Sequence, residues 1–386
     1  LADVLAPLTA TATGDLSDLL VALENVTTVK EFEANLEELA PVAQITMLGQ
    51  SFQLAGMFGE AVDLRLSEAR AVFRALAQGV MDPDDPATWP LLASNGDLAA
   101  LGSGFFLSDD RRTSIYLRLL HDQGGETGQE TYFGNSFFST GVSGGVDRLL
   151  TQGLAIGGNL AMATTEVEYD DAGESGAEIT SWSLGGYASR FGQEWHVNAQ
   201  ALAGYNQYKV DRKIAFLART AESTYNSIML SASLSGGYDL PLGAWTISPA
   251  ASVEYARLAQ QGYEEQGAGV ANLTVAAQNA NSLATGLGLG VSRKCETETL
   301  VIVPELWALW THEFFTRDMT VDTSMAGNPS QVYSMRGAEP DRDVFRLGTG
   351  ITLQADNGSS FSLRYQGDFS EHTWSNGGVL EYRVTF

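Results

Sequence analysis

The sequence has few cysteines, few basic residues and no long apolar run, and each shortage excludes a class of protein. The 386-residue chain holds one cysteine, Cys295, so a disulfide scaffold is excluded. There are 22 basic residues against 47 acidic ones, and a net charge of −25 would repel nucleic-acid phosphates. A membrane-spanning helix needs about 20 consecutive apolar residues. The longest such stretch, 300–310, is short and contains Glu305.

Residues that carry catalysis or bind cofactors are also poorly represented. No glycine-rich loop precedes a helix in a phosphate-binding pattern, and no nucleophile is paired in sequence with a base. The chain has four histidines on separate predicted strands or loops, without metal-ligand spacing: His121, His196, His312 and His372. We therefore expect neither an enzyme nor a bound cofactor or metal.

What the chain does contain is glycine, aromatic residues and an uneven distribution of acid. Hydrophobic residues make up 44% of the chain, which argues against wholesale disorder, and glycine is frequent at 41 positions. Residues 1–110 carry 17 acidic and 4 basic residues, a net charge of −13. The other 276 residues carry 30 and 18, a net of −12, so the front is far more acidic per residue. This asymmetry indicates two regions.

The front region has the apolar periodicity of helices. Leucines at three- and four-residue spacing predict helix over 15–40. The proline-free run 42–78 has apolar residues around more than one stripe, which is typical of a helix enclosed by protein. Residues 82–110 are rich in turn formers and predict a connector.

After Arg111 the apolar period changes from 3.6 to 2, as in strands with one apolar and one polar face. In 195–206, for example, Trp195 and every second residue as far as Tyr205 form the apolar face. Twelve strands are predicted: 113–121, 133–149, 152–168, 178–191, 193–208, 223–239, 244–262, 281–294, 299–316, 342–355, 359–370 and 376–386.

Three features favour a membrane barrel over a soluble sandwich. The strands are 10–18 residues long in the main, which exceeds the usual five or six and suffices to cross a bilayer. Aromatic residues lie near both ends of the apolar faces, as in interfacial girdles. Short connections alternate with long ones at 122–132, 169–177, 209–222, 263–280, 317–341 and 371–375. Since a sheet in hydrocarbon must close on itself, we predict an all-β transmembrane barrel of 12 antiparallel strands, with an N-terminal α-helical segment.

Four motifs occur in order along these strands: Gly144-Gly-Val-Asp147 with Gly153–Gly158, Pro304–Phe314, Gly337–Asp343 with Arg346–Gly350, and Leu380–Phe386. In this order, residues 111–386 resemble the translocator (β) domain of bacterial autotransporters, the type V secretion family. The stretch 81–111 departs from the family, in which the pore helix leads quickly into the first strand.

The resemblance implies a barrel in the bacterial outer membrane that anchors and exports an N-terminal passenger. It divides the chain into an acidic helical passenger remnant or linker (1–41), a pore helix and connector (42–111) and the barrel (112–386). The implied partners are outer-membrane lipid, the barrel assembly machinery and the chain's own passenger or helix in the lumen. We expect a monomer, and no nucleic-acid partner.

Charged residues on the inward faces are the candidate site. Glu305, Arg346, Arg364, Glu381 and Arg383 fall on the polar side of their strands. They form a predicted lumen charge network that could bind the pore-helix acids Glu60, Asp63 and Glu68. The alternative is a network that only closes the barrel. Leu380, Tyr382, Val384 and Phe386 resemble the family's assembly signal, with a plain lipid-facing strand as the alternative.

Other functions remain open at this point. A porin-like channel plugged by its helical N-terminal segment would show the same strands. A surface enzyme or adhesin would use the long loops 263–280 and 317–341 to bind a ligand, and a soluble β-sandwich would share the alternation.

Overall fold

The computed structural model gives the fold of most of the chain. It describes residues 5–9, 12–77, 104–106, 113–128, 133–151, 153–171, 173–297, 299–315, 320–336, 341–355 and 360–383.

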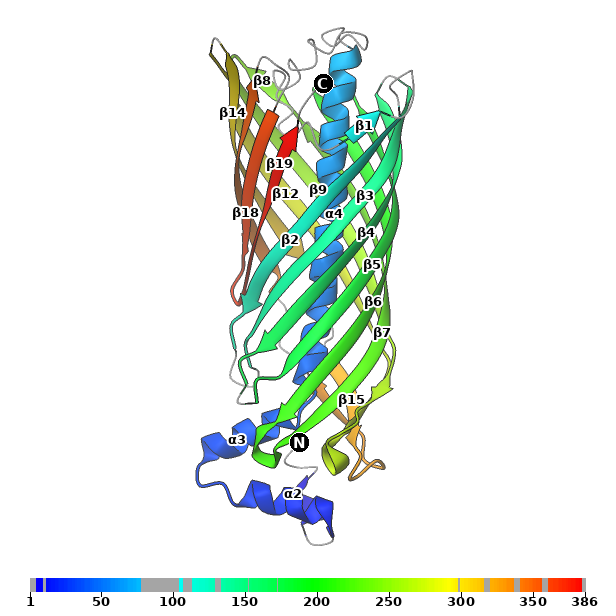
Figure 1. Cartoon of the computed structure of the whole chain (residues 1–386), viewed down its shortest axis with the longest axis vertical. Coiled ribbons are helices and arrows are strands. Elements are labelled where there is room, and N and C mark those ends of the chain that lie inside the picture. The colour runs from blue at the N-terminus through cyan, green and yellow to red at the C-terminus, as the bar shows by residue number, and fades with distance from the viewer. Residues whose placement is uncertain are drawn as a thin grey trace.

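Twelve long strands form a closed antiparallel barrel in which neighbours along the chain are neighbours in the sheet (Figure 1). Around the ring these strands are β2 (Thr113–Glu126), β3 (Asn135–Thr151), β4 (Leu154–Tyr169), β5 (Gly176–Phe191), β6 (Trp195–Ile214), β7 (Arg219–Tyr238), β9 (Trp245–Gln260), β12 (Gln278–Arg293), β14 (Leu300–Glu313), β17 (Asp343–Ala355), β18 (Ser360–Phe369) and β19 (Thr373–Arg383). The predicted fold class and strand number are confirmed.

The ring closes between β19 and β2, where Thr373–Gly377 pair with Glu126–Asp122. The adjacent edge of β2 pairs instead with β1 (Gly104–Phe106), a short strand from the predicted connector. Within residues 81–111, the structure describes only this strand.

Smaller strands lie at the two ends of the barrel. β8 (Leu240–Leu242) and β13 (Cys295–Glu296) extend hairpins at the end with the short turns. A second, four-stranded sheet lies at the end with the long connections. It consists of β10 (Tyr263–Glu264), β11 (Leu273–Val275), β15 (Thr320–Met325) and β16 (Tyr333–Arg336).

Two predicted long loops were therefore wrong in part. The loops 263–280 and 317–341 contain the strands of the second sheet. The loop 209–222 is also largely strand, because β6 and β7 run on and are joined only by η3 (Ala215–Leu217). Its charged residues alternate with buried ones such as Val210 and Ile214, as in a strand.

Aromatic side chains ring the outer face at two levels. Trp195, Tyr238 and Trp245 are exposed near the short turns. Trp182, Tyr205, Tyr255, Trp310, Phe345, Phe369 and Trp374 are exposed toward the other end. From Trp195 to Tyr205 the strand rises about 33 Å, which at a tilt of about 40° spans roughly 25 Å, the height of an outer-membrane apolar band. The two girdles mark the lipid-facing part of the barrel.

Three α-helices precede the strands. α2 (Asp15–Glu24) and α3 (Val29–Glu38) lie outside the barrel at its long-loop end, after the short η1 (Ala6–Leu8), and α4 (Val42–Ala77) runs along the barrel axis toward the short-turn end (Figure 1). The predicted helix over 15–40 is thus two helices. No described helix is long and apolar enough to span a membrane.

A capping box explains the break between α2 and α3. Thr28 accepts a hydrogen bond from the backbone N–H of Glu31, and the Glu31 carboxylate accepts one from the backbone N–H of Thr28. This reciprocal pair starts a new helix at Val29. At the start of α2, Gly14 occupies the N-cap position without a side-chain hydrogen bond.

The positions of the girdles predict how much a charged substitution on β6 reduces the free energy of unfolding. Ala201 lies on the exposed face midway between Trp195 and Tyr205, whereas Asp211 lies on the same face beyond Tyr205. We expect Ala201→Arg to reduce the free energy of unfolding in lipid vesicles by about 2–4 kcal/mol. Asp211→Arg should cost only about 0–1 kcal/mol. Equal costs in guanidinium titrations would place the bilayer elsewhere.

Candidate functional site

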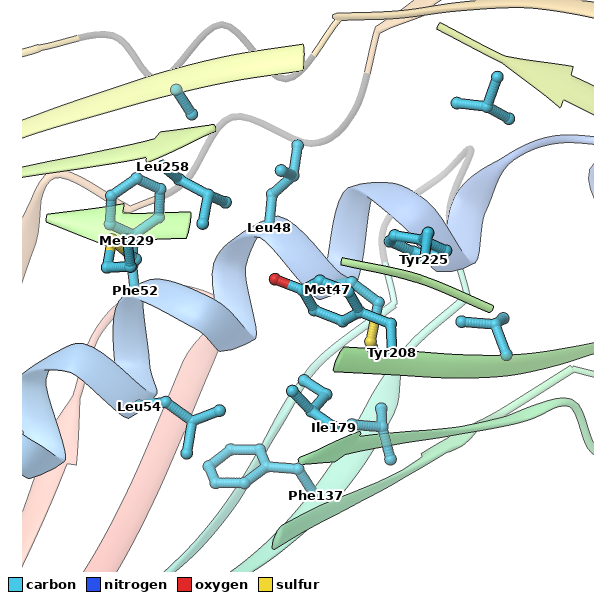
Figure 2. Close-up of a cluster of buried hydrophobic side chains, with 14 of the residues drawn as sticks. Met47, Leu48, Phe52, Leu54, Phe137, Ile179, Tyr208, Tyr225, Met229 and Leu258 are labelled. Atoms are coloured by element: carbon cyan, nitrogen blue, oxygen red, sulfur yellow. The ribbon is translucent and has the colours of Figure 1, made fainter. Parts of the chain in front are cut away.

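The lumen of the barrel is filled by α4, which meets an apolar wall near its N-terminal end. Met47, Leu48, Phe52 and Leu54 point from the helix into a cluster of buried side chains (Figure 2). The wall side of this cluster comprises Phe137, Ile179, Tyr208, Tyr225, Met229 and Leu258. We call this set the apolar collar. Its side chains are buried and packed against one another.

Hydrogen bonds inside the collar link the helix to the wall. The Ser51 hydroxyl hydrogen-bonds the Met47 carbonyl at 2.7 Å and the Tyr208 hydroxyl at 2.6 Å. The Tyr208 hydroxyl also lies 2.5 Å from Ser227 Oγ. The Tyr208 ring stacks on Tyr225, with ring centroids 4.7 Å apart. The collar thus ties helix to wall without burying an unpaired hydroxyl at Ser51.

Farther along α4 the contacts become ionic. Arg65 forks onto Asp147 of β3, with Nε–Oδ2 and Nη2–Oδ1 distances of 2.6 and 3.0 Å. Both side chains are buried, at 5% and 0% exposure. An arginine–carboxylate fork fixes direction as well as distance. It therefore sets the position of the helix along and around the barrel axis.

Neighbouring strands build the pocket around this pair. The Arg65 guanidinium lies over the Tyr116 ring, 4.9 Å from its centroid, and the Tyr187 hydroxyl donates to Asp147 at 3.3 Å. The Tyr187 ring occupies the space that a side chain at Gly157 would fill, since a Cβ there would lie 2.3 Å from it. Glycine at 157 is therefore required by close approach.

A second group of ion pairs lies across the lumen. Arg346 of β17 forks onto Asp368 at 2.6 and 2.7 Å and reaches Glu60 of α4 at 3.3 Å. Arg364 of β18 forks onto the buried Glu305 of β14 at 2.6 and 2.9 Å. Of the predicted network residues, Arg346 contacts the helix, whereas Glu305 and Arg364 pair with each other within the wall.

A second predicted helix acid, Asp63, also contacts the wall. Gln200 of β6 donates through Nε2 to the Asp63 carboxylate at 3.4 Å and to the Gly59 carbonyl at 3.3 Å. No arginine fork to Asp63 is formed among the described contacts. Farther along the helix, Arg70 donates to Asn198 at 2.9 Å.

Several predicted site residues fall outside the described residues. Val384 and Phe386 are among them, and the side chains of Glu68, Leu380, Glu381, Tyr382 and Arg383 are too. The backbone of Leu380–Arg383 continues β19 and pairs with Leu363–Ser360 of β18.

Sequence reasoning missed the Arg65–Asp147 pair, because it assigned positive charge to the wall and negative charge to the helix. The structure shows the opposite polarity here. Asp147 was visible as the last residue of the Gly144–Asp147 motif, on the inward parity of its strand, and Arg65 was one of only four basic residues before Arg111.

Among the described residues, one group has the composition of a metal centre. Ligand atoms of Asp341, Glu371 and His372 lie within 4.8 Å of one another near the mouth of the barrel. The Asp341 carboxylate already accepts hydrogen bonds from Ser370 Oγ and from the His372 backbone and ring. The bond to Asp341 raises the pKa of His372. These contacts hold the β18–β19 connection, and we assign no metal to them.

A closed barrel of tilted strands, girdled by aromatics and threaded by a helix of its own chain, defines a translocator-type barrel of the bacterial outer membrane. The autotransporter β-domain family model matches residues 115–366, well over half of the sequence. The chain belongs to this family, as its sequence motifs predicted.

Curated relatives include outer-membrane proteins and an enzyme. Outer membrane protein B of Rickettsia conorii is 22% identical over 302 residues, covering 75% of this chain and 18% of that protein. Esterase EstA of Pseudomonas aeruginosa is 29% identical over 192 residues, covering 46% of this chain and 29% of that protein. The chain thus spans less than a third of these relatives.

Solved structures show the same fold. The translocator domain of autotransporter NalP from Neisseria meningitidis aligns with a TM-score of 0.57 and 15% identity, covering 71% of this chain and 89% of that one. The β domain of the Bordetella autotransporter BrkA aligns with a TM-score of 0.50 and 18% identity, covering 71% and 100%. The chain therefore shares the barrel fold of these two domains.

The buried fork between helix and wall predicts a large mutational effect. Asp147→Asn leaves Arg65 buried without its anion, and we expect the free energy of unfolding in detergent to fall by about 3–5 kcal/mol. The double variant Arg65→Met/Asp147→Leu should lose less, because no charge stays buried. As a control, Lys209→Met removes an exposed pair with Glu178 (4.0 Å) and should cost at most about 1 kcal/mol. An Asp147→Asn effect no larger than this control would refute the assigned role.

Proposed function

We propose that this domain carries the segment N-terminal to it across the outer membrane, and that α4 then stays in the lumen as linker and seal. One observation carries the proposal. α4 enters at the long-loop end, beside α2 and α3, and extends toward the short-turn end, so the chain itself threads the barrel (Figure 1). Any segment before α2 is thereby directed to the long-loop side.

The contacts of α4 support a sealing role. The apolar collar packs against its N-terminal turns, and the Arg65–Asp147 fork and the Arg346–Glu60 contact hold it farther along. A helix of about 10 Å diameter occupies much of the lumen of a barrel of this size. A porin-like channel would require a wet path, whereas the collar is packed with buried side chains.

We further propose that the barrel is a monomer and that the barrel assembly machinery inserts it. The alternation of Leu380, Tyr382, Val384 and Phe386 at the end of the sequence supports recognition of the last strand. The chain closes its own ring through β19 and β2, where Thr373–Gly377 pair with Glu126–Asp122.

The path of α4 through the lumen predicts on which side of the outer membrane an added epitope lies. An epitope fused ahead of Leu1 should be stained by antibody on intact cells, because α2 and α3 lie at the long-loop end. The same epitope placed at Gly243, in the turn between β8 and β9, should be stained only after the cells are permeabilised. Staining of the Gly243 epitope on intact cells would reverse the orientation and overturn the proposal.

If α4 seals the lumen, the intact chain should not conduct ions. In planar bilayers the intact chain should show no steady conductance, and a variant lacking residues 1–77 should open a large, stable pore once α4 is gone. A variant lacking residues 1–14 retains all three α-helices and should remain silent. Steady conductance of the intact chain would favour a porin-like channel instead.

A further inference from the structure

Residues 15–38 form a helical hairpin, α2 and α3, that has little means of folding alone. Each helix has ten residues, fewer than an isolated helix needs in water. The segment carries seven acidic residues and one lysine, so its charges repel one another. Its helical structure therefore depends on what it contacts.

The contacts come from the long-loop end of the barrel. η3 (Ala215–Leu217), η4 (Gly269–Ala271) and Gly327 lie against the hairpin. With Arg212 and Arg219 we call this set the outer clamp. Leu19, Leu20 and Leu23 of α2 are buried in the same apolar cluster as Ala268 and Ala271.

The first residue of the hairpin is held by a fork. Arg219 donates to Asp15 through Nη1 at 2.9 Å and Nη2 at 2.5 Å, and the Val270 N–H donates to Asp15 Oδ2 at 3.2 Å. The bond from Arg219, helped by that from Val270, lowers the pKa of Asp15. A carboxylate at this position also suits the N-terminal end of a helix.

The last residue of the hairpin is held as well. Arg212 donates to the Glu38 carbonyl at 2.6 Å, which satisfies a carbonyl that the end of α3 leaves open. Arg212 is itself fixed by a buried fork onto Glu265, at 3.0 and 2.5 Å, and by the Ala271 carbonyl at 2.8 Å. The Phe216 N–H donates to the Glu38 carboxylate at 3.4 Å.

We propose that the outer clamp is a receptor for this chain's own residues 15–38, which stay bound to it, so that the exported cargo begins upstream of Asp15. The clamp residues that hydrogen-bond to the hairpin lie some 170–260 positions away in sequence. Only a finished barrel brings them together, on the side that the hairpin reaches through the lumen. The docked hairpin also prevents α4 from sliding toward the short-turn end. The term cargo rests on the proposed export function, whereas the docking does not.

Charge reversal tests the docking on intact cells that express the chain with an epitope ahead of Leu1. Limited proteolysis is followed at the α2–α3 linker, Asn25–Thr28. Asp15→Arg and Arg219→Asp should each speed cleavage about tenfold, since like charges then face each other. The double variant should recover most of the protection, though not all, because the Val270 N–H loses its acceptor.

Lys213→Asp is the matched control, because Lys213 lies one residue from Arg212 on the opposite, exposed face of β6. It should be cleaved at the unmodified rate. Heat-modifiable gel mobility confirms that each barrel is folded. Two outcomes would overturn the docking. In the first, the linker of the unmodified chain is cleaved as quickly as that of the single charge-reversal variants. In the second, the double variant recovers no protection from cleavage. Export would instead be refuted if the epitope is absent from the cell surface in every variant while the hairpin stays protected in isolated membranes.

Discussion

The architecture depends on one constraint: in hydrocarbon every backbone N–H and C=O must find a partner within the protein. A helix meets this demand by itself. A sheet meets it only as a ring. The ring imposes a period of two on every strand, with lipid on one face and the lumen on the other. Bulk composition averages the two faces, so the chain's 44% hydrophobic content conceals them.

Closing the ring creates a second demand, since a lumen of twelve strands needs more than wall side chains to fill it. The chain fills it with α4, in two different ways. The apolar collar excludes water but holds the helix with little preference for register, because apolar contacts are non-directional. The arginine forks are directional and select one register, but they would not exclude water by themselves. Sealing and positioning are therefore assigned to separate stretches of one helix.

The same constraint explains what could be predicted. Strand number and class follow from alternation, and α4 was placed within a residue because its apolar residues surround it. Where the barrel leaves the membrane, alternation no longer implies a polar face toward water. The prediction of a loop at Lys209, Asp211 and Lys213 is therefore wrong, because Val210 and Arg212 between them are buried and β6 continues through them. The pairing of Arg65 with Asp147 depends on the rotation of α4 within the ring, and a helix with apolar residues on all sides does not reveal its rotation.

The acidic front of the chain acquires a physical meaning from this arrangement. Its seven acids between Asp15 and Glu38 disfavour compaction of that segment by itself, which suits a chain that must cross a narrow lumen before it folds. Once outside, the segment meets two arginines that sit at the two ends of its hairpin, and both come from β6 and β7 where these strands project beyond the girdle. The projecting strands are thus more than an extension of the barrel. They place Arg212 and Arg219 at the two ends of the α2–α3 hairpin.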